Sequence, residues 1–66
     1  MTNEENKAVA LIGIVKAMFY GGTLPTKEQV KAIVSAIALT EEFSLPDHYT
    51  NNVTFQVSEQ LGILRL

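Results

Sequence analysis

The sequence contains no cysteine and only one histidine, His48. Without cysteine the chain has no disulfide and no thiolate nucleophile, and it has no cluster of metal ligands, so the links that often stabilise small domains are excluded. An excess of charge is also missing, since seven acidic and five basic side chains give a net charge of −2 without runs. This balance provides no basic surface for nucleic acid or for an anionic membrane.

Groups suited to catalysis are equally scarce. His48 follows Asp47, and neighbouring residues on a helix do not face each other, so Asp47 cannot orient the imidazole there. The acidic pairs at 4–5 and 41–42 are typical of solvated helix ends rather than of an active-site dyad. We therefore expect no enzyme activity, no cofactor and no metal site.

No apolar run is long enough to span a membrane. Ala8 to Phe19 is nearly all apolar, but Lys16 interrupts it and Gly21 follows it closely, whereas a spanning helix needs about 20 apolar residues. The polar start, Met1 to Lys7, lacks the basic region that opens a secretory signal. We expect a cytoplasmic protein that does not bind membranes.

What the chain does have is a large share of apolar helical sequence, with 47% hydrophobic residues. Thr2 and Glu5 have the spacing of a capping box, which predicts a helix start, and Gly21 suits the left-handed conformation that closes a helix. We predict a first helix over about 3–20. Its apolar side chains cover well over half of the circumference, although a surface helix of a monomer usually has an apolar stripe of roughly 100°.

The second predicted helix covers about 26–43 and starts with a capping box formed by Thr26 and Gln29. Its apolar residues have the helical i, i+3, i+4, i+7 spacing, at Val30, Ile33, Val34 and Ile37. Pro46 prevents the helix from continuing, and it also suits the first turn of a new one. A short helical turn over 45–49 is therefore expected.

The last third of the chain allows two interpretations. From Asn51 the residues alternate between apolar and polar, which is typical of a strand. The same segment also contains one apolar helical stripe, formed by Val53, Val57, Leu61 and Leu64. A single strand has no partner in so short a chain, so we predict a third helix over about 52–61, ended by Gly62. The apolar tail, 63–66, is expected to dock on its own bundle or in a neighbouring subunit.

These elements predict one all-α domain over residues 1–66, an antiparallel helical hairpin with a shorter third helix, completed by oligomerisation. The third helix offers only a narrow stripe, so part of the hairpin's apolar surface stays uncovered. We expect that surface to face a second copy in a symmetric dimer, or else a larger protein. The residues predicted at this interface are Ala10, Ile14, Ala17, Met18, Ala36, Leu39 and Phe43.

The predicted function is that of a small interaction module without enzyme activity, which self-associates and binds or inhibits a larger protein. Its size and composition are typical of small accessory proteins such as those of phages and mobile elements. One alternative is a binder of an anionic ligand such as a nucleotide, because a glycine-containing loop precedes the donors at the start of the second helix. The residues of that loop are Tyr20, Gly21, Gly22, Thr23, Thr26 and Lys27.

A second alternative is a DNA-binding regulator. The segment 57–63 resembles the first helix and turn of a helix-turn-helix, whose turn often contains glycine. A recognition helix would have to follow, and only three residues remain after the segment. Placing the motif on the second and third helices leaves a recognition helix with no basic residue before Arg65, which disfavours contact with phosphates.

Overall fold

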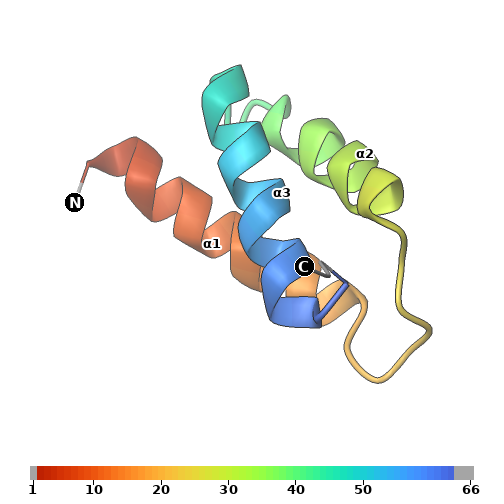
Figure 1. The fold of residues 1–66 in the computed structure, drawn as a ribbon. Helices are drawn as coiled ribbons and strands as arrows, with labels where there is room; N and C mark the ends of the chain where they lie inside the picture. Colours follow the sequence, from red (N-terminus) through yellow and green to blue (C-terminus); the bar gives the residue numbers. More distant parts are fainter. Residues whose placement is uncertain (1, 64–66) are drawn as a thin grey trace.

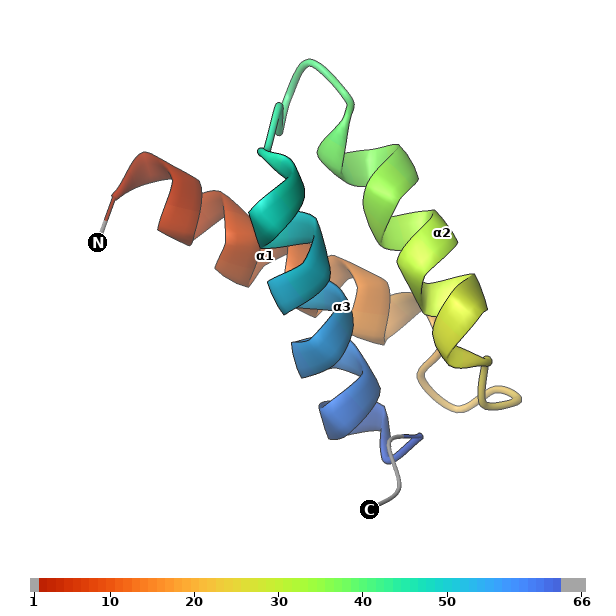
Figure 2. The ribbon, with the colours of Figure 1, turned by 45° about the horizontal axis from the view of Figure 1, so that its top comes forward.

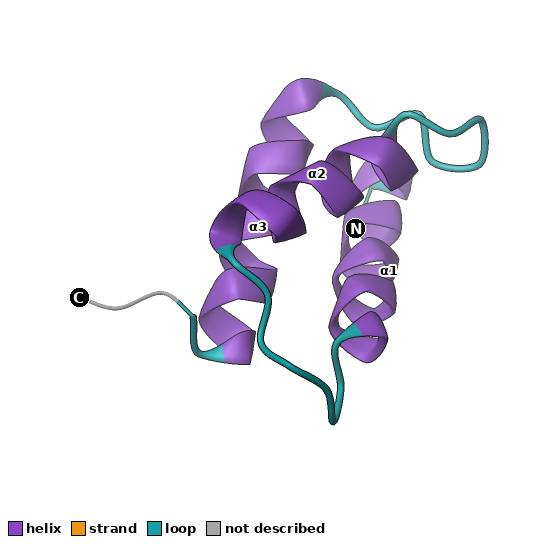
Figure 3. Cartoon of the chain, turned by 90° about the vertical axis from the view of Figure 1, so that its right-hand side faces the viewer, coloured by secondary structure: helices purple, strands orange, loops and turns teal. Residues whose placement is uncertain are grey.

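The computed structural model describes residues 2–63, which form three α-helices and no strand (Figure 1). The helices are α1 (Asn3–Met18), α2 (Lys27–Ala38) and α3 (Asp47–Leu61), joined by the two loops visible in Figure 3. The all-α prediction is confirmed. The end of the predicted tail, residues 64–66, lies outside the described residues.

The capping box predicted at the start of α1 is present. The backbone N–H of Thr2 donates to Glu5 Oε1 at 2.9 Å, and the N–H of Glu5 donates to Thr2 Oγ1 at 3.1 Å. The helix ends at Met18, two residues before the predicted end. Gly21 has the expected positive φ, 76°, and lies in the loop that follows.

The capping box predicted for α2 is present as well, but the helix is shorter than expected. It ends at Ala38 rather than near residue 43. Thr40 Oγ1 donates to the carbonyl oxygen of Ile37 at 2.7 Å, a bond by which a threonine side chain competes with helical backbone bonds. The N–H of Leu45 donates to the Ala38 oxygen at 2.9 Å. The chain therefore turns after Ala38 and brings Leu45, only 3% exposed, into the core.

The third helix is longer than predicted, because it begins at Asp47 rather than near residue 52. Pro46 precedes it with an extended backbone, and the helical turn expected over 45–49 is part of α3 from Asp47 on. Gly62 ends the helix as predicted, with φ 77°. The N–H of Gly62 donates to Glu59 and that of Ile63 to Ser58, at 3.1 and 3.0 Å, which is the bonding pattern of a Schellman motif.

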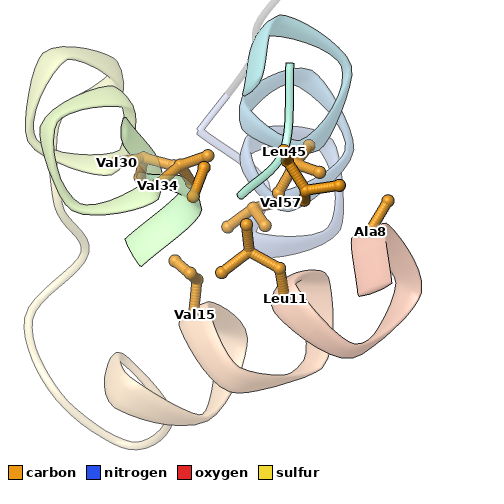
Figure 4. Packing of buried hydrophobic residues seen from close by; sticks show 9 residues of the cluster. Ala8, Leu11, Val15, Val30, Val34, Leu45 and Val57 are labelled. Carbon is orange, nitrogen blue, oxygen red and sulfur yellow. The ribbon is translucent and has the colours of Figure 1, made fainter. Parts of the chain in front are cut away.

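The central helix of the bundle is α3. It contacts both other helices, whereas α1 and α2, which run in roughly opposite directions, contact each other less (Figure 2). Apolar side chains from all three helices and from the loop before α3 converge in the core (Figure 4). The core residues are Ala8, Leu11, Val15, Val30, Val34, Ala38, Leu45, Val53 and Val57. The expectation that the third helix offers only a narrow stripe to cover the hairpin is wrong. Besides Val53 and Val57, α3 also buries Thr54 and Ser58, which widens its buried face.

Candidate interaction surface

Helix α1 keeps apolar side chains on more than one side. Its buried residues, Ala8, Leu11 and Val15, face the core. Val9 is nevertheless 56% exposed and Ile14 43% exposed, and five residues of helix separate their directions by roughly 140°. The helix therefore presents exposed apolar side chains on two different sides.

Six of the seven residues predicted at an interface are exposed, and the seventh, Phe43, is half-buried against the core. The exposed ones are Ala10, Ile14, Ala17, Met18, Ala36 and Leu39. The four on α1 share one side of that helix, which we call the Ile14 flank. Ala36 points away from the core, because it lies roughly 200° around α2 from the buried Val34. We restrict the Ile14 flank to the four residues of α1.

The six residues predicted to hold an anion are all exposed, and Tyr20 in particular is 91% exposed, whereas Pro25 in the same loop is buried. The start of α2, however, already uses donors that an anion would need. The N–H of Thr26 donates to Gln29 Oε1 at 2.8 Å, and the N–H of Gln29 donates to Thr26 Oγ1 at 3.1 Å. The capping box therefore occupies two N–H groups beside Lys27, and this weakens the case for an anion there.

Two hollows that the sequence did not predict lie between residues of α1 and α3, one near the helix starts and one near their ends, and we call the two together the α1–α3 groove. Its first part has a volume of about 390 Å³ and is lined by Glu5, Ala8, Val9, Ile12, His48, Tyr49 and Asn52. Its second part has a volume of about 590 Å³ and is lined by Gly13, Lys16, Ala17, Tyr20, Gln60 and Leu61. The starts of both helices line one part and their ends line the other, so α1 and α3 run in the same general direction.

Polar side chains from both helices line the first part of this groove. The rings of His48 and Tyr49 are 4.4 Å apart between centroids and are tilted by 37°. Across the groove, the Thr2 backbone N–H, helped by the Thr2 hydroxyl, lowers the pKa of Glu5 below its ordinary value by bonding to the carboxylate. Glu5 is thus a stable negative charge at neutral pH at the rim of an otherwise apolar wall.

No family model, curated protein or solved structure matches this chain. Among residues 2–63, no helix is long and apolar enough to cross a membrane. That same part of the chain has no group of three His, Cys, Asp or Glu side chains that could hold a metal ion.

Proposed function

We propose that this chain is a small helical interaction module that self-associates and also binds a larger protein through the Ile14 flank. The observation that supports this proposal is the exposure of large apolar side chains on α1 beyond those that build the core. Ile14 is 43% exposed and Met18 56% exposed, side by side on the helix. Contiguous exposed apolar surface is typical of interaction sites on soluble proteins.

The composition of the flank suits a helical partner. Ala10 and Ala17 are small, whereas Ile14 and Met18 are large, so the surface offers both shallow and raised positions to the ridges of a second helix. Methionine adapts its shape to different partners because it is unbranched and polarizable. Docking of an amphipathic helix on this flank would bury these side chains.

Capture of binding partners by three forms of the protein tests this part of the proposal. The baits are the wild type, Ile14→Asp and a control, Phe55→Asp, in which a similarly exposed apolar residue on α3 acquires the same charge. We expect a protein that the wild type and Phe55→Asp retain and that Ile14→Asp loses, as read by mass spectrometry. Equal capture by all three baits would contradict a binding role for the Ile14 flank.

A further inference from the structure

Four residues of α1 form a line along the α1–α3 groove. Glu5, Val9 and Ile12 line its first part, and Lys16 lines its second part. Their spacings of four, three and four residues keep them on one side of the helix. The line therefore has an acid at one end, a base at the other end and two apolar side chains between them.

This order of residues is complementary to itself when the helix is reversed. If two copies of α1 pack antiparallel around a two-fold axis between residues 10 and 11, Glu5 of each copy lies opposite Lys16 of the other copy. The same register places Val9 opposite Ile12. Every charge then meets its opposite and every apolar residue meets an apolar residue, as an interface between identical surfaces requires.

We propose that a second copy of this chain docks along the α1–α3 groove in this antiparallel register. The proposal rests on the self-association part of the proposed function and specifies the surface that carries it. Each Glu5 has one carboxylate oxygen, Oε1, bonded to the N–H of Thr2 at 2.9 Å. A carboxylate has a second oxygen, which can accept from Lys16 of the other copy.

Gly13 is an independent observation that favours close approach of another chain on this side of α1. It lies in the middle of the helix, where glycine is less favourable than alanine. A Cβ added there would meet nothing within 4 Å, so packing inside the monomer does not require glycine. Gly13 is exposed and lines the groove, and the absence of a side chain lets the backbone of a second helix come closer.

Tyr20 provides an aromatic side chain for the same interface. It is 91% exposed and lies two residues after the end of α1. In the antiparallel register, Tyr20 of one copy comes to the first end of the other copy's groove, where His48 and Tyr49 lie. Aromatic side chains are enriched at interfaces because they bury a large area while keeping a polar group available.

The proposed dimer leaves Ala10, Ile14 and Met18 of the Ile14 flank exposed, whereas Ala17 lies at the edge shared with the groove. Ile14 lies roughly 140° around α1 from Val9, so the two surfaces point in different directions. Self-association through the groove and binding of a larger protein through the flank are therefore compatible in one assembly.

Charge reversal tests the register directly. In the Lys16→Glu variant a homodimer would bring two acids together at each end, and in Glu5→Lys it would bring two bases together. We expect the homodimer of each variant to have a dissociation constant roughly tenfold or more higher than that of the wild type, as measured by sedimentation equilibrium. An equimolar mixture of the two variants should form heterodimers, because each 5–16 pair is again oppositely charged. Homodimers of both variants as tight as the wild type would overturn the proposal.

A mixture of the two variants that stays monomeric, although circular dichroism shows both variants folded, would overturn the proposal as well.

Because Glu5→Lys also removes half of the capping box, cysteine crosslinking provides a second measurement that keeps the native charges. The chain has no cysteine of its own. Val9→Cys mixed with Ile12→Cys should form a mixed disulfide faster than either pairs with the control Phe55→Cys, since disulfides need closely spaced Cα atoms. Equal rates would count against the register.

The outcomes separate the two proposals. If the wild type dimerises and the charge-reversal variants dimerise equally well, self-association is supported and the proposed surface is wrong. A wild type that stays monomeric contradicts self-association itself.

Discussion

The ammonium group of Lys7 donates a hydrogen bond to the carbonyl oxygen of Phe43 at a distance of 3.1 Å. This bond joins the first half of α1 to the loop between α2 and α3, across 36 residues of sequence. The loop is the segment that turns the chain after Ala38 and places Leu45 in the core. A single lysine on α1 thus helps to hold the turn that positions the central helix.

Replacing Lys7 with methionine should lower the free energy of unfolding by about 1 kcal/mol, because the aliphatic stem is retained and only the partly buried hydrogen bond is lost. Urea unfolding followed by circular dichroism measures the change. The matched control is Lys31→Met, which removes an exposed lysine from α2 and should have little effect. Equal urea midpoints for Lys7→Met and the wild type would show that the bond contributes nothing.

The hydroxyl of Ser58 is buried and has no hydrogen-bond partner among the described residues. Ser58→Ala should therefore raise the free energy of unfolding by about 1 kcal/mol, since an unsatisfied buried hydroxyl is removed. The neighbouring Thr54 provides the contrast, because its Oγ1 donates to the Thr50 oxygen at 2.8 Å. Thr54→Ala should lower the free energy of unfolding by about 1–2 kcal/mol. A loss of stability in both variants would mean that the Ser58 hydroxyl is satisfied.

Glu5 makes the start of α1 sensitive to acid. Its pKa is lowered in the folded protein, first by the backbone N–H of Thr2 and then by the Thr2 side chain. The stabilisation is therefore complete above the ordinary glutamate pKa of 4.5, and it is lost as the pH falls through the lower pKa of the folded state. As the pH is lowered, the midpoint of thermal unfolding should fall further for the wild type than for Glu5→Gln, whose amide keeps the capping box but does not titrate. Identical pH profiles would contradict this role of Glu5.

The starts of α1 and α2 are predictable because capping is local chemistry. The pairs of Thr2 with Glu5 and Thr26 with Gln29 satisfy backbone donors three residues away, so their spacing alone identifies a helix start. Gly62 is predictable for the same reason, since a left-handed residue suits glycine wherever it occurs. The end of α2 depends instead on Leu45 entering the core and on the bond from Lys7 to the loop, which are tertiary contacts.

The central position of α3 was not predictable from apolar periodicity. Thr54 and Ser58 widen the buried face of the helix, and a pattern that counts only apolar residues leaves both of them out. Exposure of Ile14 agrees with an apolar sector on α1 that is wider than the core needs. The α1–α3 groove could not be predicted from the sequence. Glu5 and Lys16 are recognised as lining residues only once the position of α3 beside α1 is known.

Gly13→Ala should have opposite effects on folding and on association. Alanine favours the helix, so the free energy of unfolding of the monomer should rise by about 0.5–1 kcal/mol. The added methyl group should at the same time weaken self-association, because it keeps the two α1 helices further apart. The control is Ala32→Gly at an exposed position of α2, which should destabilise the fold by a similar amount and leave association unchanged. Tighter association of Gly13→Ala would contradict close approach at this residue.

Self-association of the chain is tested most directly by the mass of the wild-type protein in solution. Sedimentation equilibrium over a wide range of concentrations should show a mass that rises from the 7.3 kDa of one chain toward twice that value. A mass that remains at 7.3 kDa up to the highest concentration would contradict the account.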